Sequence, residues 1–330
     1  GAWRRSMGIR GATTGLVLLA LAGGACAREH EVWLTPNLGS PDMVQLFARP
    51  EEWKRARGRV DVFKFYSQQV LLAPDECPFC EGNTLSAFEE VGAFAKLREW
   101  GIRVSVEVGV VKPGFCTAGV SASRAARAVE TVETLGGAVA SLSMDEPLAA
   151  SDACGLDLAA TAEETAAFVR RLRGSRPSVV VGDIEPYPLF DVATLGIWLD
   201  ALAARDARPD FFHLDVDRAT AARRGIDVAA GLKGVRALCA ERSLPFGVLL
   251  YGGDGVDDAG YFAAVLSWTD EVAAAVGMPD HVVFQSFSMS SAGLFDVPRN
   301  LPEGDPKVFS HTRLVLDGLA EFGRTGHALR

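Results

Sequence analysis

The sequence predicts an α/β fold, namely a closed (β/α)8 barrel formed by a single domain. Short apolar runs with strand character recur eight times, and segments with helix signals separate them. Strands joined by crossover helices run parallel, and eight such units at a spacing of roughly 30–40 residues match a closed barrel. A doubly wound open sheet is the alternative, but it would show a Gly-rich turn after the first strand, where this chain has Asn37-Leu-Gly-Ser40.

The expected strands are defined by period-two alternation or by short β-branched and aromatic runs. They cover 31–36, 60–66, 102–109, 139–145, 178–184, 211–217, 246–251 and 281–287.

Helix signals separate these strands. Thr84 is an expected N-cap for a helix that ends at Gly101, and Ser121 is an expected cap for the next helix. Thr161 with Glu164 predicts a capping box for a helix that ends at Gly174. Further helices are expected around Trp198, around Cys239, and over 261–276 and 311–322.

Composition limits the possible partners. The chain has 330 residues, a 48% hydrophobic content and a formal net charge of -9. This length and apolar content suit a sizeable core. Nucleic acids and anionic membranes attract basic surfaces, so neither is an expected partner. We expect a monomer that needs no cofactor and no metal ion.

The N-terminus predicts a signal peptide over residues 1–27, which leaves the barrel domain at 28–330. Three arginines precede the apolar run 15–22, and Ala25-Cys-Ala27 provides a cleavage site. The apolar run is too short to span a bilayer. Cys26 suggests a lipid anchor as an alternative, although Gly23-Gly-Ala-Cys26 lacks the usual Leu three residues before the Cys. We therefore expect a secreted or periplasmic protein, either free or lipid-anchored.

Export permits disulfides among the remaining cysteines. Cys77, Cys80, Cys116 and Cys154 fall in expected loops, and Cys239 falls in a helix. A zinc site would need a second closely spaced pair, and a redox motif would need a thioredoxin-like context. We expect at least one disulfide among the four loop cysteines.

Carboxylates and other polar residues gather near the ends of the predicted strands, where barrels carry their chemistry. The outer face of each strand packs on helices, so we assign the polar parity to the inside. The inward set is Lys64 and Tyr66, Ser105 and Glu107, Ser141, Ser143 and Asp145, Asp183 and Glu185, His213, Asp215 and Asp217, Tyr251, and Gln285. Glu146 follows directly after the fourth strand. Burying so many acids without a function would be costly.

Several of these residues also have a purely structural interpretation. Asp217 can terminate its strand, and Asp183 can cap a turn. His213 is more often a core histidine than a ligand. Lys64 can serve only to neutralise an acid such as Glu107.

The pattern resembles the TIM-barrel glycoside hydrolase superfamily over residues 31–322. Asp145-Glu146-Pro147 is similar to the Asn/Asp-Glu-Pro element after strand four of its largest clan, whose Glu is the general acid/base. The resemblance implies that role for Glu146. The clan's nucleophile is a Glu at the end of strand seven, where this chain has Leu250-Tyr-Gly-Gly253.

Two other carboxylate pairs fit glycoside hydrolysis, which needs one proton donor and one ionised partner. One pair is Asp145 with Asp215, on strands four and six, and the other is Glu146 with Glu185, on strands four and five. We favour Glu185 as the partner, with Asp215 holding substrate hydroxyls. Seven other inward residues are expected to bind the carbohydrate: Lys64, Tyr66, Glu107, Asp183, Asp217, Tyr251 and Gln285.

Two further functions remain open at this point. Clustered Asp and Glu can hold Mg²⁺ or Ca²⁺ for a metal-dependent hydrolase or isomerase. The absence of a strand-seven acid also fits a barrel that binds carbohydrate without catalysis. Gly252-Gly-Asp-Gly255 superficially fits a phosphate loop, but its acidic surroundings favour a simple turn.

Overall fold

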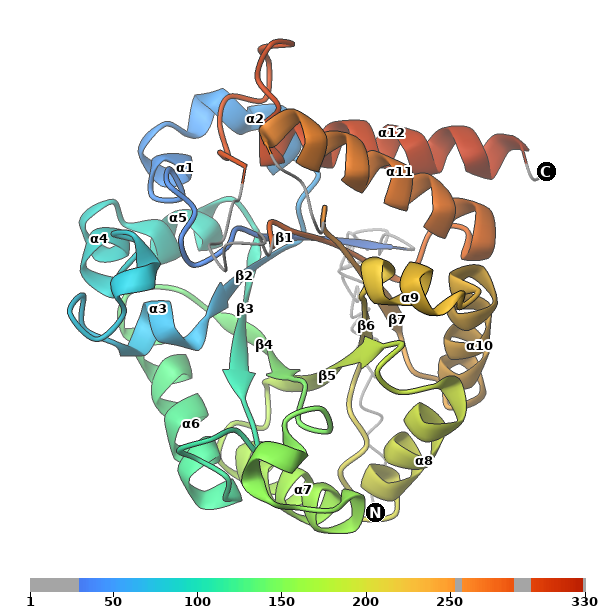
Figure 1. Cartoon of the computed structure of the whole chain (residues 1–330). Coiled ribbons are helices and arrows are strands. Elements are labelled where there is room, and N and C mark those ends of the chain that lie inside the picture. The colour runs from blue at the N-terminus through green and yellow to red at the C-terminus, as the bar shows by residue number, and fades with distance from the viewer. Residues whose placement is uncertain (1–29, 253–256, 288–297, 329–330) are drawn as a thin grey trace, which may run out of the picture.

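The computed structural model describes residues 30–252, 257–287 and 298–328, and these form a closed (β/α)8 TIM barrel. Each strand pairs in parallel with the next, and β8 closes the ring on β1 (Figure 1). The strands are β1 (Glu31–Thr35), β2 (Val62–Tyr66), β3 (Arg103–Gly109), β4 (Val139–Asp145), β5 (Val180–Tyr187), β6 (Phe212–Val216), β7 (Phe246–Leu250) and β8 (His281–Gln285). All eight expected strands and the expected fold class are confirmed.

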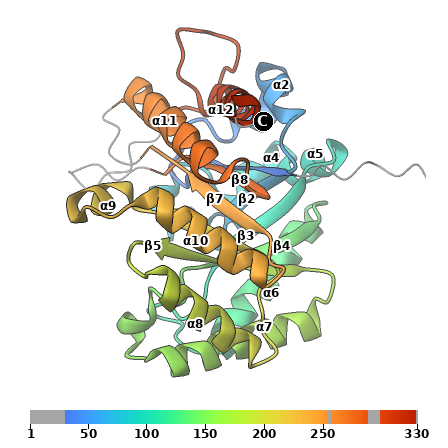
Figure 2. The same ribbon diagram turned by 90° about the vertical axis from the view of Figure 1, so that its right-hand side faces the viewer.

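Helices cover the outside of the barrel, as the side view of α10 and α11 shows (Figure 2). The α-helices are α1 (Gln45–Ala48), α2 (Lys54–Arg57), α3 (Ser67–Leu71), α4 (Leu85–Glu90), α5 (Ala93–Glu99), α6 (Ala118–Thr134), α7 (Leu158–Ser175), α8 (Val192–Ala203), α9 (Arg218–Arg224), α10 (Val228–Glu241), α11 (Asp258–Val276) and α12 (His311–Ala328). Single 3-10 turns span Pro50–Trp53, Pro78–Cys80 and Ser151–Cys154. No helix in these ranges is both long and apolar enough to cross a bilayer.

Two apolar clusters hold the barrel together. The larger one joins the outer faces of the strands to the helices. The smaller one fills the inside of the barrel and consists of Trp33, Val62, Ile184, Phe211, Leu249 and Val283. Trp33 is a buried residue of this inner cluster, with its ring 5.2 Å from that of His281.

Three helix-boundary predictions are wrong in detail. The segment 84–101 forms two helices, because Gly92 adopts a left-handed φ of 63° between them. The N-cap residue of α6 is Thr117, and Ser121 lies one turn inside the helix. Asp157 caps α7, since its carboxylate accepts the Ala160 N–H at 2.8 Å, while Thr161 donates to the Asp157 carbonyl.

The expectation of a disulfide is confirmed twice. Cys77 bonds to Cys80 in the loop after β2, and Cys116 bonds to Cys154, joining the loops after β3 and β4. Cys239 is a free, buried thiol, and burial raises its pKa to about 12. The predicted signal peptide and the anchor position Cys26 lie outside the described residues.

Removing the Cys116–Cys154 disulfide by a double Ala substitution is expected to lower the free energy of unfolding by about 3–4 kcal/mol. The bond closes a loop with a sequence separation of 38, and such a loop restricts the unfolded chain strongly. The same change at Cys77 and Cys80, whose separation is 3, is the control and should cost about 1–2 kcal/mol. Urea unfolding of both variants tests this, and equal losses would contradict it.

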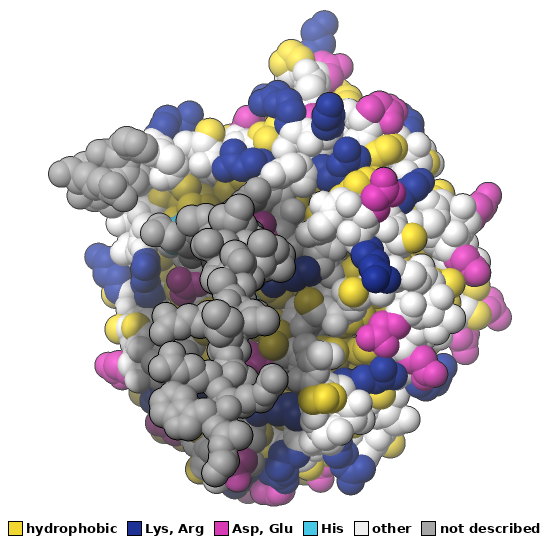
Figure 3. Space-filling model, turned by 180° about the vertical axis from the view of Figure 1, so that it is seen from behind, with side chains coloured by type: hydrophobic (Ala, Val, Ile, Leu, Met, Phe, Trp, Pro, Cys, Tyr) yellow, Lys and Arg dark blue, Asp and Glu magenta, His cyan; other side chains and the backbone are white. Residues whose placement is uncertain are grey.

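Charges of both signs cover the surface. Viewed from the side opposite to Figure 1, Lys and Arg side chains lie among Asp and Glu side chains (Figure 3). Ion pairs such as Arg242–Asp200 at 2.8 Å and Arg176–Glu133 at 3.0 Å join neighbouring surface elements. Exposed pairs of this kind contribute about 0–1 kcal/mol each to the free energy of unfolding, so the stability of the barrel rests mainly on its apolar clusters.

Candidate active site

A cavity of about 430 Å³ opens where the strands end. Its walls come from β2, β3, β4, β6 and β8, from α3 and α6, and from the segments that follow β1, β3, β4 and β8. The lining residues are Asn37, Leu38, Tyr66, Ser67, Gln68, Glu107, Gly109, Lys112, Phe115, Arg124, Asp145, Glu146, Asp215, Gln285 and Phe287. Four of these are carboxylates, and the carboxyl ends of the strands are where TIM-barrel enzymes in general carry their active sites.

Glu146 is the residue directly after β4. Its backbone has a φ of 48°, and its N–H donates to the Ile184 carbonyl at 3.1 Å. Burial, followed by the charges of Asp215 and Asp145, raises the pKa of the Glu146 carboxyl to about 8, against the lowering effect of Lys112. Glu146 is therefore mainly protonated at neutral pH, which is the state that a proton donor needs.

Asp215 lies on β6 and faces the same cavity. Burial raises its pKa to about 6, against the lowering effect of a hydrogen bond from the Tyr251 hydroxyl, which lies 2.7 Å from Oδ1. At neutral pH Asp215 is therefore mainly ionised while Glu146 is mainly protonated. Of the charged groups around Glu146, Asp215 acts on it most strongly. Two carboxyl groups whose pKa values are held apart can divide acid and base roles.

Asp145 is held by a cation. Lys112 Nζ lies 2.9 Å from Asp145 Oδ2, and the Asp145 side chain is 38% exposed. Burial lowers the pKa of Lys112, but the charge and hydrogen bond of Asp145 outweigh burial, so the net shift is upward. Lys112 therefore remains a cation in the cavity wall, where it can bind hydroxyl oxygens of a ligand.

A buried cluster supports the floor of the cavity. Lys64 Nζ lies 2.5 Å from Glu107 Oε2 and 3.0 Å from Gln285 Oε1. Glu107 and Gln285 line the cavity, whereas Lys64 does not. Burial raises the pKa of Glu107, and Lys64 opposes that rise. Lys64 thus neutralises Glu107, as the sequence analysis allowed. It also orients Glu107 and Gln285, the two cavity residues that it contacts.

The inward assignment of Asp183 and Glu185 on β5 is wrong. The sheet register pairs the cavity residues Asp145 and Asp215 with Ile184 and Pro186, so the alternate residues of β5 point outward. Asp183 accepts a hydrogen bond from the Trp198 indole at 2.8 Å. From the sequence, the outer face of each strand was expected to be apolar. The outer face of β5 carries carboxyl groups because Trp198 of α8 and the loop after β4 supply hydrogen-bond donors for them.

Glu185 is fully buried and does not line the cavity. Its Oε1 accepts the Leu148 N–H at 2.7 Å, and its Oε2 accepts the Ala149 N–H at 3.3 Å. Burial raises its pKa well above the usual range, and the charge of Asp183 adds to the effect. Glu185 therefore contacts the loop that carries Glu146 and not the cavity.

Asp217 and His213 also have structural roles. Asp217 is the N-cap of α9 and accepts the Thr220 N–H at 2.8 Å. His213 Nε2 lies 2.9 Å from Nδ1 of His281 inside the barrel, and burial lowers the pKa of both rings. Neither Asp217 nor His213 lines the cavity.

Two tyrosines complete the site. Tyr66 lines the cavity, and its buried hydroxyl has no hydrogen-bond partner among the described residues. Burial raises the Tyr66 pKa well above its usual value, so the hydroxyl keeps its proton for donation. Tyr251 is not in the lining but places its hydroxyl between Asp215 and the Val216 carbonyl.

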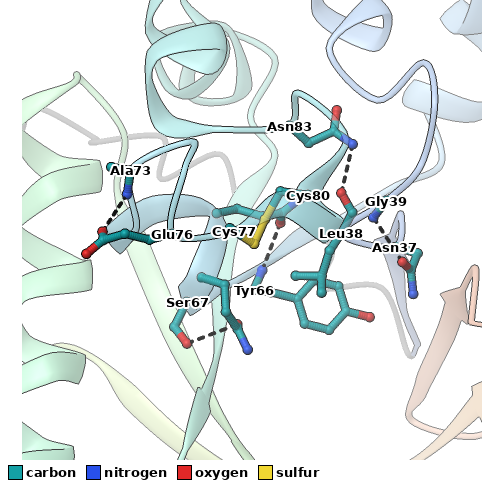
Figure 4. The surroundings of a disulfide bond; sticks show 12 residues. Asn37, Leu38, Gly39, Tyr66, Ser67, Ala73, Glu76, Cys77, Cys80 and Asn83 are labelled. Atoms are coloured by element: carbon teal, nitrogen blue, oxygen red, sulfur yellow. Dashed lines mark hydrogen bonds between the residues drawn. A yellow bond between two sulfur atoms is a disulfide. The ribbon is translucent and has the colours of Figure 1, made fainter. Parts of the chain in front are cut away.

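The wall next to Tyr66 is held by the loop that contains Cys77 and Cys80 (Figure 4). The Asn83 amide donates to the Leu38 carbonyl at 2.8 Å and to the Ser40 carbonyl at 2.6 Å. Leu38 and Tyr66 both line the cavity, so these contacts join the loops after β1 and β2 on one side of it.

Sequence reasoning missed the wall residues that lie at or beyond the strand ends. They are Asn37, Leu38, Lys112, Phe115 and Phe287 in loops, Ser67 and Gln68 in α3, Arg124 in α6, and Gly109 at the end of β3. Strand alternation carries no information about residues beyond a strand end. The sequence did offer one signal: a basic and an aromatic residue, Lys112 and Phe115, lie shortly before Cys116 in an expected loop.

No group of three or more His, Cys, Asp or Glu side chains in the described ranges is arranged to hold a metal ion. Three of the four cavity carboxylates have polar partners: Lys64 pairs with Glu107, Lys112 pairs with Asp145, and the Tyr251 hydroxyl donates to Asp215.

No protein-family model and no curated protein sequence matches this chain. Solved structures do match. A glucosidase from Croceicoccus marinus superposes with a TM-score of 0.54 at 13% identity, covering 89% of this chain and 68% of that one. Active domain 2 of a chitinase from Pyrococcus furiosus gives 0.51 at 13% identity, covering 89% and 96%. An endo-β-1,4-mannanase from Cellulomonas fimi gives 0.53 at 16% identity, covering 89% and 70%. This chain therefore has the TIM-barrel fold that these glycoside hydrolases share.

Proposed function

We propose that the protein is a glycoside hydrolase in which Glu146 is the general acid/base and Asp215 is its catalytic partner. The observation that carries this proposal is that both carboxyl groups line one cavity with pKa values of about 8 and about 6. Glycosidic bond cleavage needs one protonated and one ionised carboxyl group on either side of the bond. The shared fold supports the same class of reaction.

In this mechanism Glu146 gives its proton to the glycosidic oxygen as the bond breaks. Asp215 either attacks the anomeric carbon or removes a proton from the attacking water. In the first case, water then cleaves the bond between Asp215 and the sugar, Glu146 takes a proton from that water, and Asp215 leaves as a carboxylate. In the second case Asp215 holds the proton taken from water and Glu146 is ionised, and proton exchange with solvent restores both groups. NMR of the freshly formed product distinguishes the two routes, because the first retains and the second inverts the anomeric configuration.

The rest of the cavity suits a carbohydrate. Glu107, Gln285 and Lys112 offer polar atoms for sugar hydroxyls, and the Tyr66 hydroxyl has no other partner in the described structure. Phe115 and Phe287 add apolar surface for a sugar ring. We propose glucans, chito-oligosaccharides and β-1,4-mannans as first substrates, since the proteins of the same fold are a glucosidase, a chitinase and a mannanase.

The two disulfides support an exported protein, because such bonds persist in oxidising compartments. Together with the sequence of residues 1–27, they favour secretion or a periplasmic location.

A carbohydrate-binding barrel without catalysis is the second candidate. One observation favours it. After strand seven this chain has Tyr251, whereas the glycoside hydrolase clan that it resembles has its nucleophilic Glu there. A protein of this kind would bind a glycan and leave it intact.

The dependence of kcat/KM on pH is expected to be a bell centred near pH 7. Activity falls below a pH of about 6 because Asp215 becomes protonated and loses its charge. It falls above a pH of about 8 because Glu146 loses the proton that it must donate. Initial rates over this range on the best substrate check the prediction, and a rate that is flat above pH 8 would contradict the role of Glu146.

A further inference from the structure

The peptide that carries Glu146 has an unusual backbone. Glu146 adopts a φ of 48°, a region that residues other than Gly seldom occupy. The chain then turns back, since the Ala150 N–H donates to the Glu146 carbonyl at 3.0 Å. A conformation of this kind persists only where its surroundings enforce it.

Strand β5 supplies that enforcement at three points. The Glu146 N–H donates to the Ile184 carbonyl at 3.1 Å. The next two available N–H groups, those of Leu148 and Ala149, donate to the two carboxyl oxygens of Glu185 at 2.7 and 3.3 Å. Pro147, between Glu146 and Leu148, has no N–H. Every backbone donor from Glu146 to Ala149 is thus held by two adjacent residues of β5.

Within the described residues, the Glu185 carboxyl group makes no hydrogen bond other than these two. It is fully buried, it points away from the barrel interior and it does not line the cavity. A buried carboxyl group is costly unless its oxygens are hydrogen-bonded, and buried N–H groups are costly without an acceptor. The carboxyl group and the two N–H groups satisfy each other, which fixes the loop relative to the sheet.

We propose that Glu185 is a positioning residue that holds the Glu146–Ala149 turn and thereby directs the Glu146 carboxyl group into the cavity beside Asp215. This inference rests on the proposed function for its kinetic consequences, whereas the contact with the turn is independent of any activity.

Two substitutions at this position form a graded test. Glu185→Gln keeps one acceptor oxygen for two N–H donors, and Glu185→Met keeps the approximate size and removes both acceptors. Because a displacement of about 1 Å costs about 10²-fold in rate, we expect Glu185→Met to lower kcat by about 10²-fold and Glu185→Gln by about 10-fold. KM should change by less than about 3-fold, since Glu185 touches no substrate.

The matched controls are Asp183→Asn and Asp183→Leu. Asp183 lies two residues earlier on the same outward side of β5 and is equally buried, but it bonds to Trp198 of α8 and not to the Glu146 loop. Both controls should lower thermal stability while kcat stays within about 2-fold of wild type. Equal loss of kcat in the Asp183 and Glu185 variants would show a general structural effect and overturn the proposal.

Hydrogen exchange gives a readout that does not need activity. Peptides covering 146–150 should exchange at least about 10-fold faster in Glu185→Met than in Asp183→Leu, while the strands keep their protection. The pKa of Glu146, followed by carbon NMR, should shift from about 8 in the Glu185 variants only. Unchanged exchange and an unchanged Glu146 pKa would overturn the positioning role. If the wild type cleaves no glycan, the proposed function fails, and these two measurements still decide the role of Glu185.

Discussion

Replacing Glu146 by Gln is expected to lower turnover by about 10²–10⁴-fold, the usual effect of losing a positioned proton donor. The amide has nearly the same shape as the protonated acid that the raised pKa favours at neutral pH, so the fold and glycan binding should persist. Single-turnover rates and binding constants on the same glycan separate these two effects.

Asp152→Asn is the control for this variant. Asp152 is an exposed acid in the same loop after β4, and it does not line the cavity. Its substitution should leave turnover unchanged. Normal turnover in Glu146→Gln would remove Glu146 from the mechanism.

Replacing Asp215 by Asn is expected to lower turnover by at least about 10²-fold, because an amide is neither a base nor a nucleophile. Loss of the Asp215 charge should also lower the pKa of Glu146 from about 8, since Asp215 is the charge that raises it most. The upper limb of the residual pH profile should therefore move to lower pH.

Tyr251→Phe is the companion variant. It removes the hydrogen bond that lowers the pKa of Asp215, so the lower limb should move above a pH of about 6 while turnover at pH 8 is largely retained. If Asp215→Asn is nearly normal and Glu185→Gln abolishes turnover, the pairing of Glu146 with Glu185 is right and the present assignment is wrong.

The sequence was sufficient to predict the barrel, because each strand has a period-two or β-branched run and segments with helix character separate the strands. Alternation also placed Tyr66, Glu107, Asp145, Asp215 and Gln285 in the cavity wall. These positions were predictable because the outer face of their strands is apolar.

The same rule failed on β5, where both faces carry buried groups. The donors that satisfy Asp183 and Glu185 come from Trp198 and from the loop after β4, which are distant in sequence. These hydrogen bonds depend on how separate elements pack together, so no local sequence pattern predicts them. Lys112 and Phe115 were missed because loops have no periodicity.

Release of reducing ends from glucans, chito-oligosaccharides and β-1,4-mannans, measured beside binding of the same glycans, tests the central claim most directly. The account predicts that the wild type cleaves at least one of them and that Glu146→Gln binds it with similar affinity but does not cleave it. Binding by the wild type without any cleavage would contradict the account and identify a non-catalytic carbohydrate-binding barrel.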